Sequence, residues 1–307
     1  MSSNTNLIAL SFDVEEWFSV RNMRDFFSLE NWHEQESRVR IGLDFILNEL
    51  DKKNIKSTFF ILGWLADHFP QIVKDIDSRG HEVGTHGYSH TPIDLLTPET
   101  FEEDLRKSIV ALESITGKKV KGFRAPSFSV TKETAWAISI IKKCGLEYDS
   151  SIFSTVHPDY GINKFPTRIT NVNGLVEVPL QKGKFFGLNI PVSGGGYFRM
   201  FPYWLIKSTL KQTLKDDSVV MYFHPWEFDP TQPKVNLPKL KKFRHYVGLN
   251  SNKGKFLNLL EDFQFTTIEN LIAIEAMKAP FKHYQLEVKA PATAALIGSL
   301  PYSPTSP

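Results

Sequence analysis

The strongest constraint on the fold is a regular alternation of strand-like and helical patterns along the 307 residues. Short apolar runs, such as residues 7–13 and 57–62, alternate with segments of helical spacing, such as residues 66–79, 98–116 and 131–144. This rhythm predicts a parallel sheet covered by helices, hence an α/β fold. About seven or eight such units favour a closed barrel over an open sheet, and barrels of this kind carry their chemistry at the carboxyl ends of the strands.

Two regions depart from this rhythm. Residues 150–200 are rich in glycine and loop signals, and we expect them to form a cover over the site. Residues 278–307 are rich in Ala, Pro, Ser and Thr and lack periodicity, which predicts a disordered or loosely packed tail. Residues 1–277 are therefore expected to form a single barrel domain.

Composition narrows the class of protein. A formal net charge of +2 provides no overall field for nucleic acid, so no nucleic-acid partner is expected. A single cysteine, Cys144, excludes an internal disulfide and fits a reducing compartment. The N-terminus has no basic segment of the signal-peptide type, and no apolar window is long enough to cross a membrane. We expect a cytoplasmic protein without stable membrane insertion.

The segment that carries the clearest chemistry is Gly80-His-Glu-Val-Gly-Thr-His-Gly-Tyr-Ser-His90. It places His86 and His90 four residues apart, so that on a helical turn both face the same way. Nine histidines in the chain make a chance pair common, but the surrounding glycines fit a loop at a barrel mouth. Asp13 and Glu15, at the end of another strand-like run, supply carboxylates. Two histidines, one carboxylate and an open position suit a hydrolytic metal centre.

Two more strand ends carry polar residues. Arg124 stands in Phe-Arg-Ala-Pro-Ser-Phe128, and His224 stands in Met-Tyr-Phe-His-Pro-Trp-Glu-Phe-Asp229. Taken alone, Arg124 fits a surface ion pair and His224 fits a hydrogen-bonded strand-end histidine. Their order along the chain, together with the two earlier motifs, favours one shared site.

In this order the motifs resemble those of the NodB-like polysaccharide deacetylases, the fourth family of carbohydrate esterases. The resemblance covers roughly residues 7–270. It implies a distorted (β/α)7 barrel of a single domain that removes an N-acetyl group from an amino sugar. It also implies a divalent metal, with Zn²⁺ the first choice and Co²⁺, Ni²⁺ or Mn²⁺ as alternatives.

Carried over residue by residue, the resemblance makes His86 and His90 metal ligands. The family opens on Thr-Phe-Asp-Asp, whose first Asp is the general base and whose second binds the metal, but here Val14 stands in the second position. Because residues two apart on a strand share a face, Glu15 can take over as ligand and leave Asp13 as base. The swapped assignment, with Asp13 on the metal and Glu15 as base, stays open.

The resemblance also assigns Arg124 to orient the base and His224 to act as general acid. Tyr148-Asp149-Ser150 lies where a further Asp-containing motif would support Arg124. The Asp-Val-Glu opening motif resembles that of a subgroup associated with exopolysaccharide or surface-polysaccharide genes. Four further residues are candidates for substrate contacts, from the glycine-rich run and the late motifs: Tyr197, Arg199, Trp226 and His245.

The leading hypothesis is a metal-dependent carbohydrate N-deacetylase that acts on an acetamido sugar in a polysaccharide or glycan precursor. An acetamide is a poor electrophile, so its hydrolysis needs a Lewis acid, a base for the water and an acid for the departing amine. Two alternatives remain. One is a cyclic amide or ureide hydrolase of the same fold, and the other is a catalytically inactive glycan-binding module, which Val14 favours.

Overall fold

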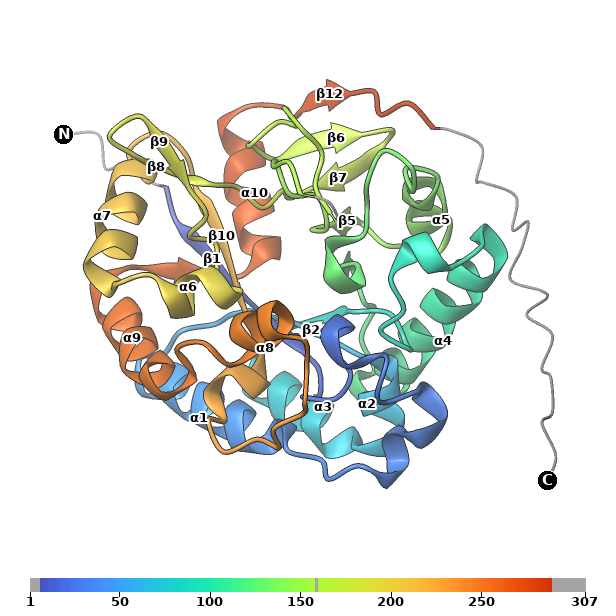
Figure 1. Ribbon diagram of the computed structural model, residues 1–307. Coiled ribbons are helices and arrows are strands. Elements are labelled where there is room, and N and C mark those ends of the chain that lie inside the picture. Colours follow the sequence, from blue (N-terminus) through green and yellow to red (C-terminus); the bar gives the residue numbers. More distant parts are fainter. Residues whose placement is uncertain (1–5, 158–159, 289–307) are drawn as a thin grey trace, which may run out of the picture.

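The computed structural model describes residues 6–157 and 160–288, and its strands form one large sheet and one small hairpin (Figure 1). In the described part of the chain, seven strands run parallel in the order β10-β1-β2-β3-β4-β5-β7. These are β1 (Ile8–Val14), β2 (Thr58–Ile61), β3 (Glu82–Thr85), β4 (Gly122–Phe123), β5 (Tyr148–Asp149), β7 (Leu175–Glu177) and β10 (Val219–Phe223).

Shorter strands extend this sheet. β6 (Thr170–Val172) pairs antiparallel with β7, and β12 (Lys282–Tyr284) pairs parallel with β6. β11 (Phe265–Thr266) adds to the start of β1, and the hairpin is formed by β8 (Gly183–Phe185) and β9 (Leu188–Ile190). The parallel α/β architecture predicted from the alternation is therefore confirmed.

Helices lie around the sheet and over one end of it (Figure 1). They are α1 (Val39–Lys52), α2 (Gly63–His68), α3 (Pro70–Ser78), α4 (Pro98–Thr116), α5 (Ala137–Lys143), α6 (Gly195–Met200), α7 (Tyr203–Thr213), α8 (Lys239–Tyr246), α9 (Leu249–Asp262) and α10 (Ile268–Lys278). In the described residues no helix is both long and apolar enough to cross a membrane.

The inside of the curved sheet has its own core, separate from the core between sheet and helices. Ala9, Phe60, Tyr148 and Val220 of the strands meet Leu271 of α10 in this inner cluster. The hydrogen-bonded strand order has β10 at one end and β7, with its added strands, toward the other. In Figure 1, α10 stands between these two sides of the sheet, so its apolar face contributes to the interior at the place where they are not paired.

Two predicted helices differ from the observed ones. Residues 66–79 belong to two helices, α2 and α3, which are divided at Phe69 because Pro70 restricts the residue before it and begins a new helix. Within residues 131–144 only α5 is helical. Upstream of it, the Thr134 hydroxyl donates to the Ser129 carbonyl at 2.6 Å, a local side-chain bond that competes with a helical turn.

The two irregular regions contain more structure than expected. Residues 150–200 include β6 to β9 and α6, and α6 contributes to the cavity described below. The beginning of the predicted tail is also structured, because β12 pairs with β6, and Asn173 bonds Leu286 through both its side-chain oxygen and nitrogen. Residues 289–307, the rest of the predicted tail, lie outside the described residues.

Candidate metal centre

The inner face of β1 positions the two carboxylates. Along this strand Leu10, Phe12 and Val14 pack into the core beneath the helices, so the alternate residues point to the inside of the barrel. Asp13 and Glu15 both lie on this inner side at the carboxyl end of the strand, and their side chains are almost fully buried. Val14 therefore faces away from the barrel interior and packs in the core under the helices. The inner face at this end of the strand is left to Asp13 and Glu15.

The two histidines lie on the loop after β3, and this loop is not a helical turn. Gly87 and His90 both adopt positive φ angles, of 74° and 52°, which reverse the chain between the two rings. The Asp104 carboxylate of α4 holds the loop, because it accepts hydrogen bonds from the backbone N–H groups of Tyr88 at 2.7 Å and Ser89 at 3.0 Å. The predicted helical geometry is wrong, but the loop still brings His86 and His90 within 5.1 Å, measured between ring centres.

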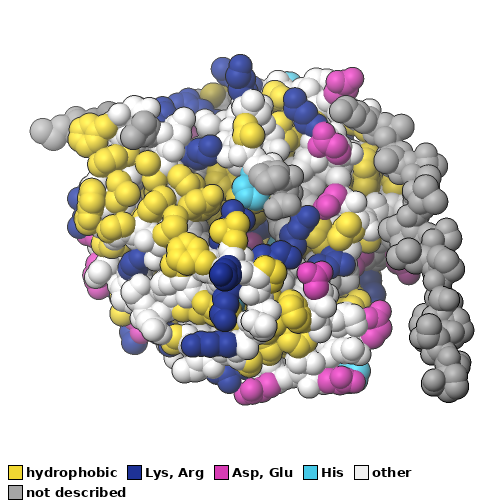
Figure 2. All heavy atoms as spheres, in the orientation of Figure 1, with side chains coloured by type: hydrophobic (Ala, Val, Ile, Leu, Met, Phe, Trp, Pro, Cys, Tyr) yellow, Lys and Arg dark blue, Asp and Glu magenta, His cyan; other side chains and the backbone are white. Residues whose placement is uncertain are grey.

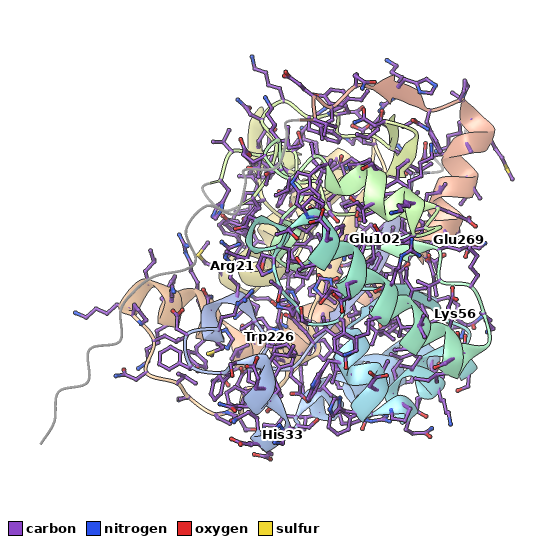
Figure 3. All side chains as sticks on the ribbon, turned by 90° about the vertical axis from the view of Figure 1, so that its right-hand side faces the viewer. Arg21, His33, Lys56, Glu102, Trp226 and Glu269 are labelled. Atoms are coloured by element: carbon purple, nitrogen blue, oxygen red, sulfur yellow. The ribbon has the colours of Figure 1, made fainter. Side chains whose placement is uncertain are left out.

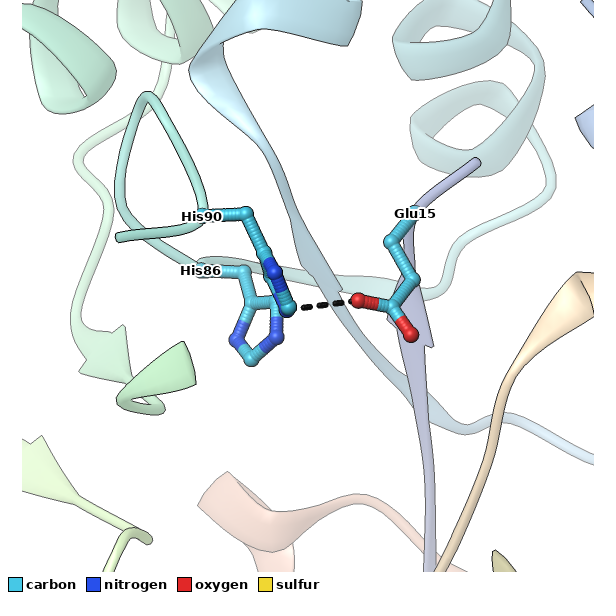
Figure 4. A group of neighbouring side chains, drawn as sticks. All are labelled: Glu15, His86 and His90. Atoms are coloured by element: carbon cyan, nitrogen blue, oxygen red, sulfur yellow. Dashed lines mark ion pairs between the residues drawn. The ribbon is translucent and has the colours of Figure 1, made fainter. Parts of the chain in front are cut away.

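Glu15, His86 and His90 form a buried cluster whose potential ligand atoms all lie within 4.8 Å of one another (Figure 4). The His90 Nε2 atom is 2.6 Å from the Glu15 Oε2 atom. His86 Nδ1 lies 2.7 Å from the Arg124 carbonyl oxygen, which places the N–H on that nitrogen. The lone pair of Nε2 is therefore available to a metal ion. Trp226 Nε1 donates to the other Glu15 oxygen at 2.9 Å.

This cluster fits a divalent ion. Two imidazoles and one carboxylate are a ligand set that Zn²⁺ prefers, and each member is oriented or buried by the protein. Burial lowers the pKa of His86 to about 4, which keeps its ring neutral and able to coordinate. Burial raises the pKa of Glu15, but His90, His224 and His86 outweigh it and bring the pKa down to about 2.

Arg124 and Asp13 form a second, fully buried unit beside the cluster. The Arg124 Nη1 atom donates to Asp13 Oδ1 and to Ser11 Oγ, both at 2.8 Å. Its Nε and Nη2 atoms donate to the Ser150 carbonyl and hydroxyl, both at 3.0 Å. Arg124 is 0% exposed, so the surface ion-pair interpretation is excluded, and the pair fixes the position of the Asp13 carboxylate.

Asp149 does not support Arg124 as the predicted motif suggested. It points to the opposite side of β5 from Ser150, where its carboxyl group meets that of Glu177 on the neighbouring strand. Burial raises the pKa of both carboxyl groups, and the negative charge of Asp149 raises that of Glu177 further. Ser150, a residue without charge, provides the support that sequence analysis had placed on the aspartate.

His224 faces both carboxylates of β1 from the end of β10. Its Nε2 atom is 3.6 Å from Glu15 Oε1 and 3.8 Å from Asp13 Oδ2, and its Nδ1 atom is 3.5 Å from Glu227 Oε1. Burial lowers the pKa of His224, but the carboxylates of Glu15, Glu227 and Asp13 raise it more, to about 9. Glu227 was not among the predicted site residues, although its place three residues after His224 in the late motif was a usable signal.

These groups line a cavity of about 200 Å³ at the carboxyl ends of the strands. Figure 3 shows Trp226 and Arg21, two of the lining residues, on one side of the molecule, while Lys56 and Glu269 lie on the opposite side. Since Lys56 precedes β2, the cavity is at the end of the barrel where the sequence predicted the chemistry.

The four predicted substrate contacts have different surroundings. Arg199 is buried and donates to Glu227 Oε1 at 3.2 Å and to the His245 carbonyl at 2.6 Å, so it ties α6 to α8. The rings of His224 and His245 stack on Trp226, with centres 5.2 Å and 4.6 Å away. Arg199, Trp226 and His245 line the cavity, whereas Tyr197 is not among its lining residues and stacks on Phe201.

The barrel and its polar end thus define a class, the α/β barrels with a candidate divalent-metal centre at the carboxyl ends of their strands. Residues 43–148, which include both histidines and Arg124, match the sequence model of the polysaccharide deacetylases. Residues 150–273, which include His224, match a domain of unknown function (DUF3473). Residues 43–148 are therefore similar to the polysaccharide deacetylases.

Curated relatives agree with this similarity. The chain is 37% identical to the peptidoglycan deacetylase-like protein FGM2 of Gibberella zeae over 148 residues, which cover 48% of this chain and 43% of that protein. It is 32% identical to a peptidoglycan deacetylase of Helicobacter pylori over 120 residues, 39% of either chain. The matched segments therefore span less than half the length of these relatives.

A solved structure supports the fold over a longer stretch. A crystal structure from Mycobacterium smegmatis, assigned to the polysaccharide deacetylases, covers 95% of this chain and is itself covered to 96%, with a TM-score of 0.57. The sequence identity in this comparison is 17%, so the likeness concerns the fold.

Proposed function

We propose that the protein is a metal-dependent N-deacetylase that hydrolyses the acetamide of an amino sugar within a polysaccharide or glycan precursor. The observation that carries this proposal is the position of the buried Glu15, His86 and His90 cluster beside the Arg124–Asp13 pair and His224. The deacetylase relatives support the same reaction class. The Asp-Val-Glu opening motif suggests a precursor of an exopolysaccharide or surface polysaccharide as the substrate.

Glu15, His86 and His90 would hold the metal, for which we propose Zn²⁺ because of the two imidazole ligands. Bound there, the ion would supply Lewis-acid activation of the acetamide carbonyl and of the attacking water. Trp226 orients Glu15 through its hydrogen bond, and the Arg124 carbonyl orients the His86 ring in the same way.

The remaining steps belong to residues of the chain. Asp13, held by Arg124 at 2.8 Å, accepts the proton of the water at its Oδ2 atom, the oxygen that this hydrogen bond leaves available. His224 donates a proton to the departing amine from Nε2, while Glu227 lies at 3.5 Å from Nδ1 and holds the ring. Amide cleavage then gives acetate and a free amino sugar. The ion pair supports the assignment of Asp13 as base and Glu15 as ligand, because Asp13 Oδ1 already accepts a hydrogen bond from Arg124.

The test is acetate release from N-acetylglucosamine oligomers, measured for the wild type and for the Asp13→Asn and His224→Ala variants after metal loading. We expect each variant to lose a factor of about 10² to 10⁴ in kcat while it retains its metal. His33→Ala is the matched control, because His33 is exposed and outside the cavity (Figure 3). Acetate release by the wild type that survives complete metal removal would contradict the proposal. Ring opening of hydantoin without acetate release would assign the cyclic amide alternative instead.

A further inference from the structure

An exposed hydrophobic surface lies beside the cavity. It consists of five side chains, which we call the apolar face: Phe186, Met200, Trp204, Leu240 and Phe243. Their exposed fractions run from 42% for Met200 to 84% for Phe186, although such residues are normally buried in a soluble domain. Figure 2 shows hydrophobic side chains gathered on this side of the molecule, over α6, α7 and the β8–β9 hairpin of Figure 1.

The elements that carry the apolar face are tied to one another. Arg199 of α6 donates to the Arg244 and His245 carbonyls of α8, at 3.2 Å and 2.6 Å. At the hairpin, the Phe186 N–H donates to Gln212 Oε1 of α7 at 3.3 Å, and Gly183 packs directly against α7. Side-chain contacts therefore fix α6 to α8 and the hairpin to α7.

The chemistry of α8 identifies the kind of partner. Its eight residues, Lys239-Leu-Lys-Lys-Phe-Arg-His-Tyr246, include three lysines and one arginine, all exposed, and no acidic residue. Leu240 and Phe243, three residues apart on this helix, stand on one side among these charges. A basic helix that exposes apolar side chains has the composition of segments that lie in the interface of an anionic bilayer.

A second copy of the chain is a poorer partner for this surface. A symmetric dimer places the same patch of both subunits together, so the four cations of α8 would face the four of the other copy. Repulsion between them opposes such a contact, whereas lipid phosphates attract them.

We propose that the apolar face and α8 dock the protein on an anionic membrane surface, without crossing the bilayer. The same elements form part of the cavity wall, since Gly195 and Gly196 of α6 and Arg244 and His245 of α8 line it. Docking through them brings the cavity mouth to the lipid headgroups. Such docking does not depend on the proposed deacetylation.

The experiment measures binding of the full chain to vesicles of phosphatidylcholine with and without phosphatidylglycerol, by co-sedimentation. The charge variant is Lys239→Gln/Lys242→Gln. The apolar variant is Phe186→Asn/Trp204→Ser, in which asparagine suits the positive φ of 46° at Phe186. The control is Val110→Ser/Met277→Ser, which removes exposed apolar side chains (67% and 87% exposed) from α4 and α10.

We expect the wild type and the control to bind the anionic vesicles alike, and more tightly than neutral ones. The charge variant should bind about 30-fold more weakly, and the apolar variant about tenfold or more weakly. Absence of wild-type binding to anionic vesicles, or equal binding by all variants, would overturn the proposal. So would a wild-type dimer in analytical ultracentrifugation that the apolar variant converts to monomer, because the face would then be a contact between copies.

Discussion

Replacing Arg124 with methionine tests the buried ion pair that positions Asp13. The two side chains are 0% and 2% exposed, so the change leaves the Asp13 carboxylate away from solvent without its cation. It also removes the donor to Ser11 and the two donors to Ser150. Removing one partner of a buried pair costs about 3–5 kcal/mol, because the remaining charge is not compensated. We expect Arg124→Met to lower the free energy of unfolding by about this amount.

The assay is urea unfolding in the presence of a chelator, so that metal loss does not contribute to the difference. A second variant separates charge from packing. In an Asp13→Asn background the cost of Arg124→Met should fall by about 1–3 kcal/mol, since no unpaired carboxylate is then left behind. Arg106→Met is the control, because Arg106 pairs with Glu102 at the surface and no measurable change is expected.

Either of two results would show that Arg124 does not compensate a buried charge on Asp13. One is an Arg124→Met variant whose unfolding free energy lies within about 1 kcal/mol of the wild type. The other is an unchanged cost of Arg124→Met when Asp13 has been replaced, which would show that the two groups are not coupled.

Three further predictions follow from buried contacts. Burial raises the pKa of Asp149 and Glu177, so the folded state keeps protons that the unfolded chain releases above about pH 4. The free energy of unfolding should therefore fall as pH rises. Glu177→Gln should reduce this fall, measured by urea unfolding between acidic and neutral pH. Trp226→Phe removes the 2.9 Å hydrogen bond to Glu15 and should weaken metal affinity about 10- to 100-fold in chelator competition. Glu16→Ala removes the carboxylate that accepts two backbone N–H groups at the start of α1 and should lower the unfolding free energy by about 2 kcal/mol.

Local sequence patterns were enough to predict the parallel α/β fold and the position of the two carboxylates at the end of β1. The two-residue period of a strand is enough to show that Asp13 and Glu15 share a face and that Val14 does not, and the structure has this arrangement. The spacing of His86 and His90 also located the cluster, although their loop has a different geometry. Its positive φ angles depend on Asp104, a residue of α4 that no local pattern connects to this loop.

Contacts between distant segments account for the partners of Arg124 and Arg199 that sequence analysis did not predict. The family resemblance placed an Asp-containing motif at Tyr148-Asp149-Ser150, but Ser150 accepts the hydrogen bonds of Arg124, and Asp149 pairs with Glu177 instead. Arg199 lines the cavity, where a substrate contact was predicted, and it also donates to carbonyl groups of α8. The contact of Arg199 with α8 has no signal in the local sequence, because it depends on how elements from different parts of the chain pack together.

The most direct test of the central claim is the metal content of the purified protein, determined by elemental analysis after incubation with Zn²⁺ and removal of the excess. We predict about one divalent ion per chain in the wild type and in the exposed-histidine control His33→Ala, and a loss of this ion in a His86→Ala/His90→Ala double variant. Absence of the ion in the wild type, or its retention in the double variant, would contradict the assignment of Glu15, His86 and His90 as the metal centre.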